Sequence, residues 1–204
     1  MNIIFLGPQS SGKGTQAEFL SQKLNIPIVT TGGIFRAKKA EGDKEIADLI
    51  DKGMLVPDEV TDRIVKEELE KDKYNNGVIL DGYPRNTAQA NTLEGYFKIN
   101  KVIFLDVPDG VVLKRMSARR ICTSCGTIFN LNSKPPKVDD KCDNCGGELA
   151  QRDDDTSQAI AKRLNIYHEH TEPLIHYYED RLIKIDGTKS IEDVWQEIQQ
   201  KLGI

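Results

Sequence analysis

The sequence contains no apolar run that approaches the ~20 residues needed to cross a bilayer as a helix, and hydrophobic residues make up 38% of its 204 residues. It also lacks an excess of positive charge, since the formal net charge is −4 and the pI is about 5.5. A protein that binds nucleic acids or membrane surfaces in general would carry an excess of Lys and Arg. The amino terminus shows no basic segment, apolar core or cleavage site of a secretory leader. We therefore expect a cytoplasmic protein with neither a membrane nor a nucleic acid as its partner.

Low-complexity tracts and internal repeats of 20–50 residues are also absent. Of the three histidines, His168 and His170 stand two apart in a helical stretch and point to different faces, and His176 follows a turn or two later. We therefore expect none of them to bind a metal. The chain is long enough for one large α/β core with small insertions.

Five short apolar runs recur along the chain and predict the strands of a parallel sheet. Each run is nearly continuous, as expected for a strand that is buried on both faces. Stretches with helical spacing of apolar residues separate the runs, and this alternation predicts a doubly wound α/β fold. The runs are Ile3–Leu6, Ile26–Val29, Val78–Leu80, Val102–Leu105 and Leu182–Ile185.

Three of the intervening stretches have clear helical signals. A helix is predicted to begin near Lys13, and another to cover Asp58–Lys71, directly after Pro57. Near the end, Ser190 and Asp193 form a plausible N-cap pair for a last helix. Its apolar face comprises Ile191, Val194, Trp195, Ile198 and Leu202.

Two regions interrupt the alternation of strands and helices. Residues 30–56 are mainly polar and predict a small lobe of short helices. Residues 121–151 are rich in Cys, Pro, Gly, Asn and Asp and predict a flap held by a metal. Residues 1–29, 57–120 and 152–204 then form the core.

The glycine-rich segment Gly7–Thr15 follows the first apolar run and is the most informative feature of the chain. Backbone N–H groups of such a loop point inward and bind a polyphosphate. Lys13 adds a positive charge at the outer phosphates, and Thr15 can place a hydroxyl on a phosphate-bound Mg²⁺. Gly14 occupies the Ser/Thr position of the general phosphate-loop (P-loop) pattern, and the resulting G-K-G-T order is typical of nucleoside monophosphate kinases.

The four cysteines form two C-x-x-C pairs, Cys122 with Cys125 and Cys142 with Cys145, separated by sixteen residues. This spacing is typical of a tetrahedral zinc site built from two knuckles. Four protein ligands leave no open position, so we expect a structural ion.

Three other readings of the cysteines remain open. Two disulfides would suit a secreted protein, but nothing in the sequence suggests export. A redox C-x-x-C usually occurs once, at a strand–helix junction. A nucleic-acid-reading zinc ribbon would need more aromatic and basic residues than Phe129, Lys134 and Lys137 supply.

Several arginines and aspartates stand at positions that suit phosphoryl transfer, which needs positive charge around the transferring group. Arg85 ends the segment Asp81–Arg85 directly after a predicted strand, Arg119 and Arg152 flank the cysteine segment, and Arg163 follows in a helix. Asp81 at its strand end is a candidate to hold a water of hydrated Mg²⁺. The alternative interpretation of Asp81 is a turn or cap residue, and Asp106 competes with it for the magnesium role. The run Asp153-Asp154-Asp155 is interpreted as a helix start, with a secondary possibility that it orients an arginine.

These segments together resemble the adenylate kinase family over essentially the full chain. The loop Gly7–Thr15 is similar to its G-x-x-G-x-G-K-G-T, with Gln9-Ser10-Ser11 in place of the usual Pro-Gly-x. The other matching segments are Thr30–Arg36, Gly53–Pro57, Asp81–Arg85 followed by Gln89, Ser117–Arg120 and Arg152–Arg163. The cysteine segment resembles the zinc-bearing lid of the long bacterial forms.

The resemblance implies a P-loop fold with a five-stranded parallel sheet, a helical AMP-binding insertion and a zinc-held lid. It implies the reaction ATP + AMP ⇌ 2 ADP with Mg²⁺ on the triphosphate, in a protein that we expect to be a monomer. It places the transferring group among Lys13, Arg85, Arg119, Arg152 and Arg163. The implied ATP contacts are Ser10, Ser11, Gly12, Lys13, Gly14, Thr15, Arg115, Arg119, Ile128, Phe129 and Lys189. The implied AMP contacts are Thr31, Arg36, Met54, Val56, Gly82, Arg85, Gln89, Arg152 and Arg163.

Other functions compete with this one. A kinase for another nucleoside monophosphate would share the same motifs, although Thr31 and Gln89 favour AMP by resemblance. A zinc-ribbon protein with a nucleotide-dependent switch would bind RNA or DNA, and the acidic pI argues against it. A P-loop ATPase would release phosphate without AMP.

Overall fold

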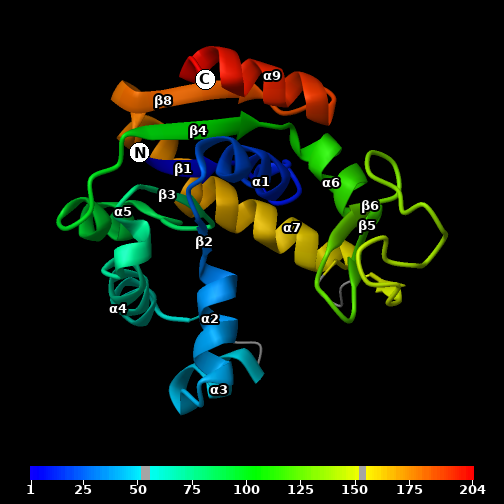
Figure 1. Ribbon diagram of the computed structural model, residues 1–204, viewed down its shortest axis with the longest axis horizontal. Coiled ribbons are helices and arrows are strands. Elements are labelled where there is room, and N and C mark those ends of the chain that lie inside the picture. The colour runs from blue at the N-terminus through cyan, green and yellow to red at the C-terminus, as the bar shows by residue number, and fades with distance from the viewer. Residues whose placement is uncertain (52–55, 152–154) are drawn as a thin grey trace.

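A five-stranded parallel sheet forms the centre of the molecule (Figure 1). The computed structural model describes residues 1–51, 56–151 and 155–204. The strand order is β2-β3-β1-β4-β8, so the first strand lies in the middle and the chain winds outward in both directions. The strands are β1 (Asn2–Leu6), β2 (Ile28–Thr30), β3 (Val78–Asp81), β4 (Lys101–Asp106) and β8 (Leu182–Asp186). The predicted doubly wound fold is confirmed.

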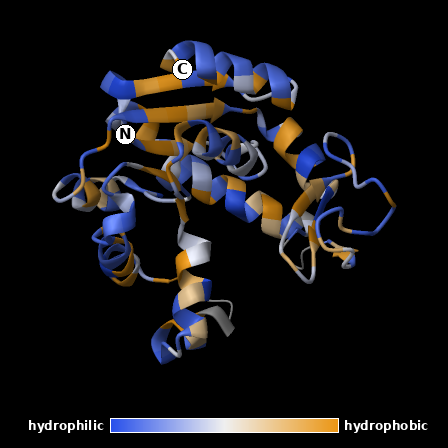
Figure 2. Ribbon diagram, viewed as in Figure 1, coloured by the Kyte–Doolittle hydropathy of each residue, from blue (hydrophilic) through white to orange (hydrophobic). Residues whose placement is uncertain are grey.

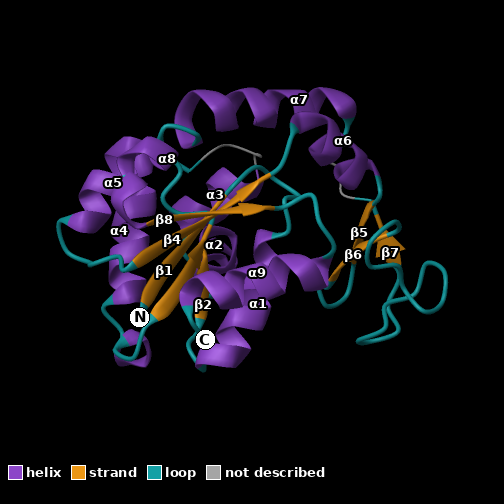
Figure 3. Ribbon diagram, turned by 90° about the horizontal axis from the view of Figure 1, so that it is seen from above, coloured by secondary structure: helices purple, strands orange, loops and turns teal. Residues whose placement is uncertain are grey.

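Helices cover both faces of this sheet (Figure 3). On one face α1 (Lys13–Leu24) and α9 (Ile191–Leu202) pack on alternate strand residues, among them Ile3 and Ile103. On the other face the intervening residues, among them Ile4 and Val102, pack against α4 (Asp58–Leu69), α5 (Thr87–Glu94) and α8 (Leu174–Tyr177). The strands are accordingly mostly hydrophobic (Figure 2), which is the pattern that predicted them.

Most predicted element boundaries agree with the structure. The helix after the phosphate loop begins at Lys13, and Ser190 caps α9 by accepting a hydrogen bond from the Asp193 N–H. The second strand is the exception, because it runs from Ile28 to Thr30 rather than from Ile26 to Val29. Pro27 has no N–H to donate to a ladder, although its carbonyl accepts from the Ile79 N–H at 2.9 Å. Ile26 is buried in the core without being part of the strand.

Two insertions project from the core (Figure 1). The first contains α2 (Thr31–Ala40) and α3 (Lys44–Asp51). The second, the lid, is a small antiparallel sheet in the order β6-β5-β7. Its strands are β5 (Arg119–Cys122), β6 (Ile128–Asn130) and β7 (Leu149–Ala150), so its sheet begins two residues before the predicted segment 121–151.

Helices α6 (Asp109–Ser117) and α7 (Ser157–Ile166) connect the lid to the core. Helix α7 continues into a π-helical turn, η2 (Tyr167–Thr171). Two 3₁₀ turns, η1 (Asp72–Tyr74) and η3 (Glu179–Arg181), precede β3 and β8. Within the described ranges, none of the helices combines the length and apolar character that crossing a membrane requires.

A charged cluster at the end of α4 joins this helix to η1. Glu68 accepts hydrogen bonds from Lys71 at 2.6 Å and from the Tyr74 hydroxyl at 2.6 Å, and Lys73 lies 2.8 Å away. Partial burial by itself would raise the pKa of Glu68, but these three donors outweigh it and lower that pKa to about 2. The ionised carboxylate therefore stabilises the fold.

We predict that Glu68→Gln lowers the free energy of unfolding by about 1–2 kcal/mol at pH 7, after allowance for solvent screening. Because the folded-state pKa lies below the ordinary value of 4.5, this contribution is complete above about pH 4.5 and is lost as the pH falls toward about 2. Urea unfolding at pH 7 and pH 3.5 measures it, with Glu70→Gln as the control for an exposed neighbour. A difference between wild type and Glu68→Gln that stays constant across the two pH values would contradict this assignment.

Candidate active site

The phosphate loop runs between β1 and α1 in a conformation that depends on its glycines. Gly7 has a φ of 140°, and a Cβ there would lie 2.7 Å from the Leu105 carbonyl oxygen. Gly12, the N-cap of α1, has a φ of 102°. Ser10 also has a positive φ of 55°, although it is not a glycine. The loop therefore turns tightly at the carboxyl end of β1, with the N-terminus of α1 facing it.

Lys13 and Asp81 form the charged centre of this loop. The Lys13 Nζ donates to the carbonyl oxygens of Gly7 at 2.8 Å and Pro8 at 2.7 Å. Asp81 ends β3 beside the first turn of α1, where a Cβ on Gly14 would lie 3.8 Å from its Oδ2. Burial lowers the pKa of Lys13 and raises that of Asp81, and the attraction between the two opposes both shifts.

Asp106, the alternative to Asp81, ends β4 in a different environment. Its Oδ2 lies 2.7 Å from the Lys184 Nζ, in a salt bridge exposed to solvent. Asp81 is thus the aspartate that lies beside the phosphate loop.

A cleft of about 290 Å³ opens between the phosphate loop, the lid and the β8–α9 loop. Arg115 joins two of its walls, because its guanidinium donates to the Ser11 carbonyl at 3.2 Å and the Gly187 carbonyl at 2.8 Å. The volume and partly apolar lining of the cleft suit a planar base. The predicted ATP contacts that line it are Ser10, Ser11, Gly12, Thr15, Arg115, Arg119, Ile128, Phe129 and Lys189, whereas Lys13 and Gly14 do not.

Two arginines meet the buried carboxylate of Asp155 between the lid and the phosphate loop. Arg119 donates through Nε at 2.7 Å and also through Nη2, and the Arg163 Nη1 lies 3.5 Å away. The Arg119 Nη1 in addition reaches the Ser10 hydroxyl at 3.5 Å. The Asp155 side chain is 0% exposed. Asp155 therefore orients both arginines, a role that the sequence suggested only as a secondary possibility. Arg152 lies outside the described residues.

A second polar network lies at the carboxyl ends of β2 and β3. The Arg85 side chain donates to the Gly82 carbonyl at 2.9 Å and to the Thr31 hydroxyl at 3.3 Å. The backbone N–H of Arg85 donates to the Gln89 Oε1 at 2.8 Å. The predicted AMP contacts Thr31, Gly82, Arg85 and Gln89 are thus brought together.

The remaining predicted AMP contacts are spread around this network. Arg36 is exposed, and its Nη1 lies against Gly32 within α2, where a Cβ on Gly32 would be 3.3 Å away. Val56 packs against the hydrophobic core. Met54 lies outside the described residues.

One contact to this network has no signal in the sequence. The Thr171 hydroxyl, in the π-helical turn η2, donates to the Arg85 carbonyl oxygen at 2.8 Å. The continuous helix formed by α7 and η2 carries Arg163 about two turns before Thr171, so it connects the lid side of the site with Arg85. A contact across 86 residues of sequence becomes visible only in the fold.

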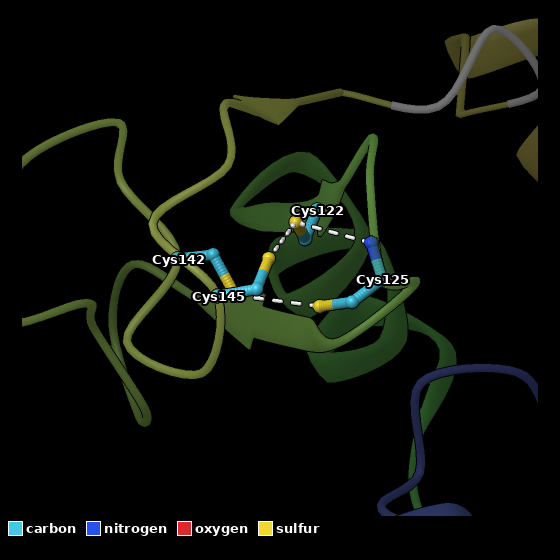
Figure 4. A group of neighbouring side chains, drawn as sticks. All are labelled: Cys122, Cys125, Cys142 and Cys145. Atoms are coloured by element: carbon cyan, nitrogen blue, oxygen red, sulfur yellow. Dashed lines mark hydrogen bonds between the residues drawn. The ribbon is translucent and has the colours of Figure 1, made fainter.

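The four cysteines converge in the lid (Figure 4). Their Sγ atoms all lie within 4.8 Å of one another, with Cys122 3.4 Å from Cys145 and Cys125 3.6 Å from Cys142. Zinc with four sulfurs at about 2.3 Å places those sulfurs about 3.8 Å apart. The donor set and spacing therefore fit a tetrahedral metal.

The protonation of these thiols also favours a cation. Hydrogen bonding by Thr127 lowers the pKa of Cys125 to about 6. The Gly147 N–H by itself would lower the pKa of Cys145, but hydrogen bonds to the sulfurs of Cys125 and Cys122 outweigh it and raise that pKa to about 12. A divalent cation would replace the protons shared among these sulfurs and hold all four as thiolates.

Comparison with known proteins agrees with this site. The adenylate kinase family model matches residues 5–183. The adenylate kinase of Archaeoglobus fulgidus is 48% identical over 209 aligned positions, which cover 98% of this chain and 96% of that protein. The adenylate kinase of Clostridium botulinum is 46% identical, covering 100% of this chain and 99% of its own length. That of Caldicellulosiruptor saccharolyticus is 45% identical over the whole of both chains.

We predict that Cys142→Ala lowers the metal content of the purified protein and its melting temperature by roughly 5 °C or more. The hydrophobic cluster of the lid comprises only Cys122, Phe129, Cys142 and Leu149, so burial contributes little to its stability. Turnover at low temperature should change much less than the melting temperature. Elemental analysis and calorimetry measure these effects, with Ser124→Ala as a control that keeps all four thiols. Unchanged melting with undiminished metal would show that the cysteines do not hold a structural ion.

Proposed function

This chain belongs to the adenylate kinase family and is an ATP:AMP phosphotransferase, and we propose that each half of its site binds one nucleotide. The observation that carries the proposal is the convergence of three elements at the carboxyl edge of the sheet. These are the loop Gly7–Thr15, the Asp155-bound arginines and the network around Arg85. Ligands of open α/β sheets bind at this edge.

ATP occupies the side of the phosphate loop. The backbone N–H groups of the loop and the Lys13 ammonium bind its phosphates, and the 290 Å³ cleft accepts its base. Arg115 and Arg119 line this cleft, and either guanidinium suits stacking on adenine. Lys189 lies at the same cleft, where its backbone is available to the base.

AMP occupies the side of Arg85. Arg85 and Arg36 supply the charge for its phosphate, and Arg85 is already held at Gly82 and Thr31 by its guanidinium. Thr31, Val56 and Gln89 serve its base and sugar, together with Met54. Thr171 keeps the Arg85 backbone in place through its 2.8 Å bond.

The transferring phosphoryl group passes between these two halves. Its negative charge is met by Lys13, Arg85, Arg119, Arg152 and Arg163, which stabilise charge without covalent chemistry. Asp155 holds Arg119 and Arg163 in fixed orientations, so less reorganisation is needed when the group moves. Closure of the lid excludes water, which otherwise competes with AMP as the acceptor.

Two metal ions complete the proposed enzyme. Asp81 presents a carboxylate beside the phosphate loop, which suits a water ligand of the Mg²⁺ that arrives with ATP and neutralises its phosphates. The four cysteines suit a structural Zn²⁺ that holds the lid sheet together. Both proposed nucleotide sites are built within one chain, which supports a monomer. We further propose that the protein acts in the cytoplasm. We also propose that residues 30–56 and 121–151 move as units relative to the core.

We predict that Lys13→Ala lowers kcat by about 10²–10³, because a preorganised charge is removed from the transferring group. ADP formation from ATP, AMP and Mg²⁺ measures it. Lys23→Ala, at the exposed end of the same helix, is the matched control and should retain full turnover. Near-normal kcat in Lys13→Ala would refute the assignment of the phosphate loop. Phosphate release without AMP would indicate an ATPase instead.

A further inference from the structure

The amide of Gln89 is held at both of its ends by other parts of the protein. Its Oε1 accepts from the Arg85 N–H at 2.8 Å, and its Nε2 donates to the Asp58 Oδ1 at 2.7 Å. Gln89 is 3% exposed, so water competes little for these bonds. No sequence motif identified Asp58, the first residue of α4, as a functional residue.

Asn86 fixes the second oxygen of Asp58. The Asn86 Nδ2 donates to the Asp58 Oδ2 at 2.7 Å, while its Oδ1 caps α5 by accepting from the Gln89 N–H at 2.8 Å. Both ends of the Asn86 amide are therefore also in use. The whole cluster has one consistent order of donors and acceptors.

This order allows only one orientation of the Gln89 amide. A backbone N–H can only donate and a carboxylate can only accept. A half-turn of the amide would set its NH₂ against the Arg85 N–H and its oxygen against the Asp58 carboxylate. Both hydrogen bonds would be lost and two repulsive contacts formed.

The fixed amide keeps one N–H and one oxygen lone pair for a ligand, in a known order. Adenine presents an acceptor at N1 and a donor at its 6-amino group, which match an amide N–H and an amide oxygen. Hypoxanthine and guanine present a donor at N1 and an acceptor at O6, which is the reverse. An amide that can turn over would accept either order, whereas one that is locked discriminates between them.

We propose that Asp58 is a positioning residue that sets the specificity for the adenine base of AMP, by locking the orientation of the Gln89 amide. This inference rests on the proposed function, in which Gln89 contacts the base of AMP. In this proposal Asp58 is not itself a contact of either nucleotide. It acts through the bond to the Gln89 Nε2.

The experiment compares AMP with inosine monophosphate (IMP), which differs from AMP only in the order of donor and acceptor at N1 and C6. In Asp58→Asn the new amide can turn to present either a carbonyl or an NH₂ to Gln89. We expect the ratio of kcat/KM for AMP over IMP to fall about tenfold. The change should appear in KM and in the dissociation constants measured by calorimetry without ATP, with kcat for AMP nearly unchanged. Asp58→Ala should shift the ratio in the same direction.

Glu59→Gln is the matched control, because it removes one negative charge from the same first turn of α4. It should leave the ratio unchanged. If Asp58→Asn and Asp58→Ala weaken AMP and IMP equally, Asp58 has only a structural role and the inference is overturned. Melting temperatures identify a variant that has lost its fold.

Gln89→Leu separates this inference from the proposed function. If its KM for AMP matches that of wild type, Gln89 does not contact the base and the proposed AMP site is wrong. If Gln89→Leu weakens AMP while Asp58→Asn keeps the wild-type ratio, only the role of Asp58 is wrong. The proposed AMP site and the role of Asp58 are both supported if Gln89→Leu weakens AMP binding and Asp58→Asn lowers the discrimination between AMP and IMP.

Discussion

The parallel register of β1, β2 and β3 is the constraint on which the site depends. Phe5 pairs with Asp81, and Asp81 pairs with Thr30, so three strands end at one level. The phosphate loop, the Asp81–Arg85 turn and the start of α2 leave the sheet side by side from there. Because side chains alternate between the two faces of a strand, a slip by one residue would turn every side chain to the opposite layer of the core. The register is therefore fixed by the core, and the site inherits its geometry from it.

Charge balance is the second constraint. A site that binds two nucleotides must gather several cations, which repel one another before the phosphates arrive. Asp155 offsets Arg119 and Arg163, and Asp81 offsets Lys13. Burying the Asp155 carboxylate is costly unless it is paired, so its position depends on the two arginines as much as theirs depend on it. Fixed partners also orient the neutral amide of Gln89, through hydrogen-bond donors and acceptors rather than through opposite charge on the amide itself.

The parts of the molecule differ in what holds them together. The sheet and its helices rest on two large apolar clusters, whereas the lid has a cluster of four residues, two of which are cysteines. A segment with so little apolar burial is suited to a metal crosslink. Helices α6 and α7 connect it to the core, and the turn η2 at the end of α7 contacts Arg85 through Thr171. The lid and the network around Arg85 are thus connected by one continuous helical segment, α7 with η2.

The sequence by itself determined the sheet, the phosphate loop and the cysteine pairs, because each depends on neighbours within a few residues. Periodicity located five strands, although the predicted start of β2 lay two residues too early and its end one residue too early, next to Pro27, which has no N–H to donate. The sequence also pointed to Lys13, Asp81 and the arginines around the lid. Only the tertiary structure decided that Asp81 rather than Asp106 lies beside the loop, that Asp155 orients two arginines, and that Asp58 and Thr171 hold Gln89 and Arg85. Asp58 and Gln89, Asp155 and Arg119, and Thr171 and Arg85 are separated by 31 to 86 residues along the chain. No local pattern encodes such contacts, since they arise when strands and helices pack and not from the residues on either side.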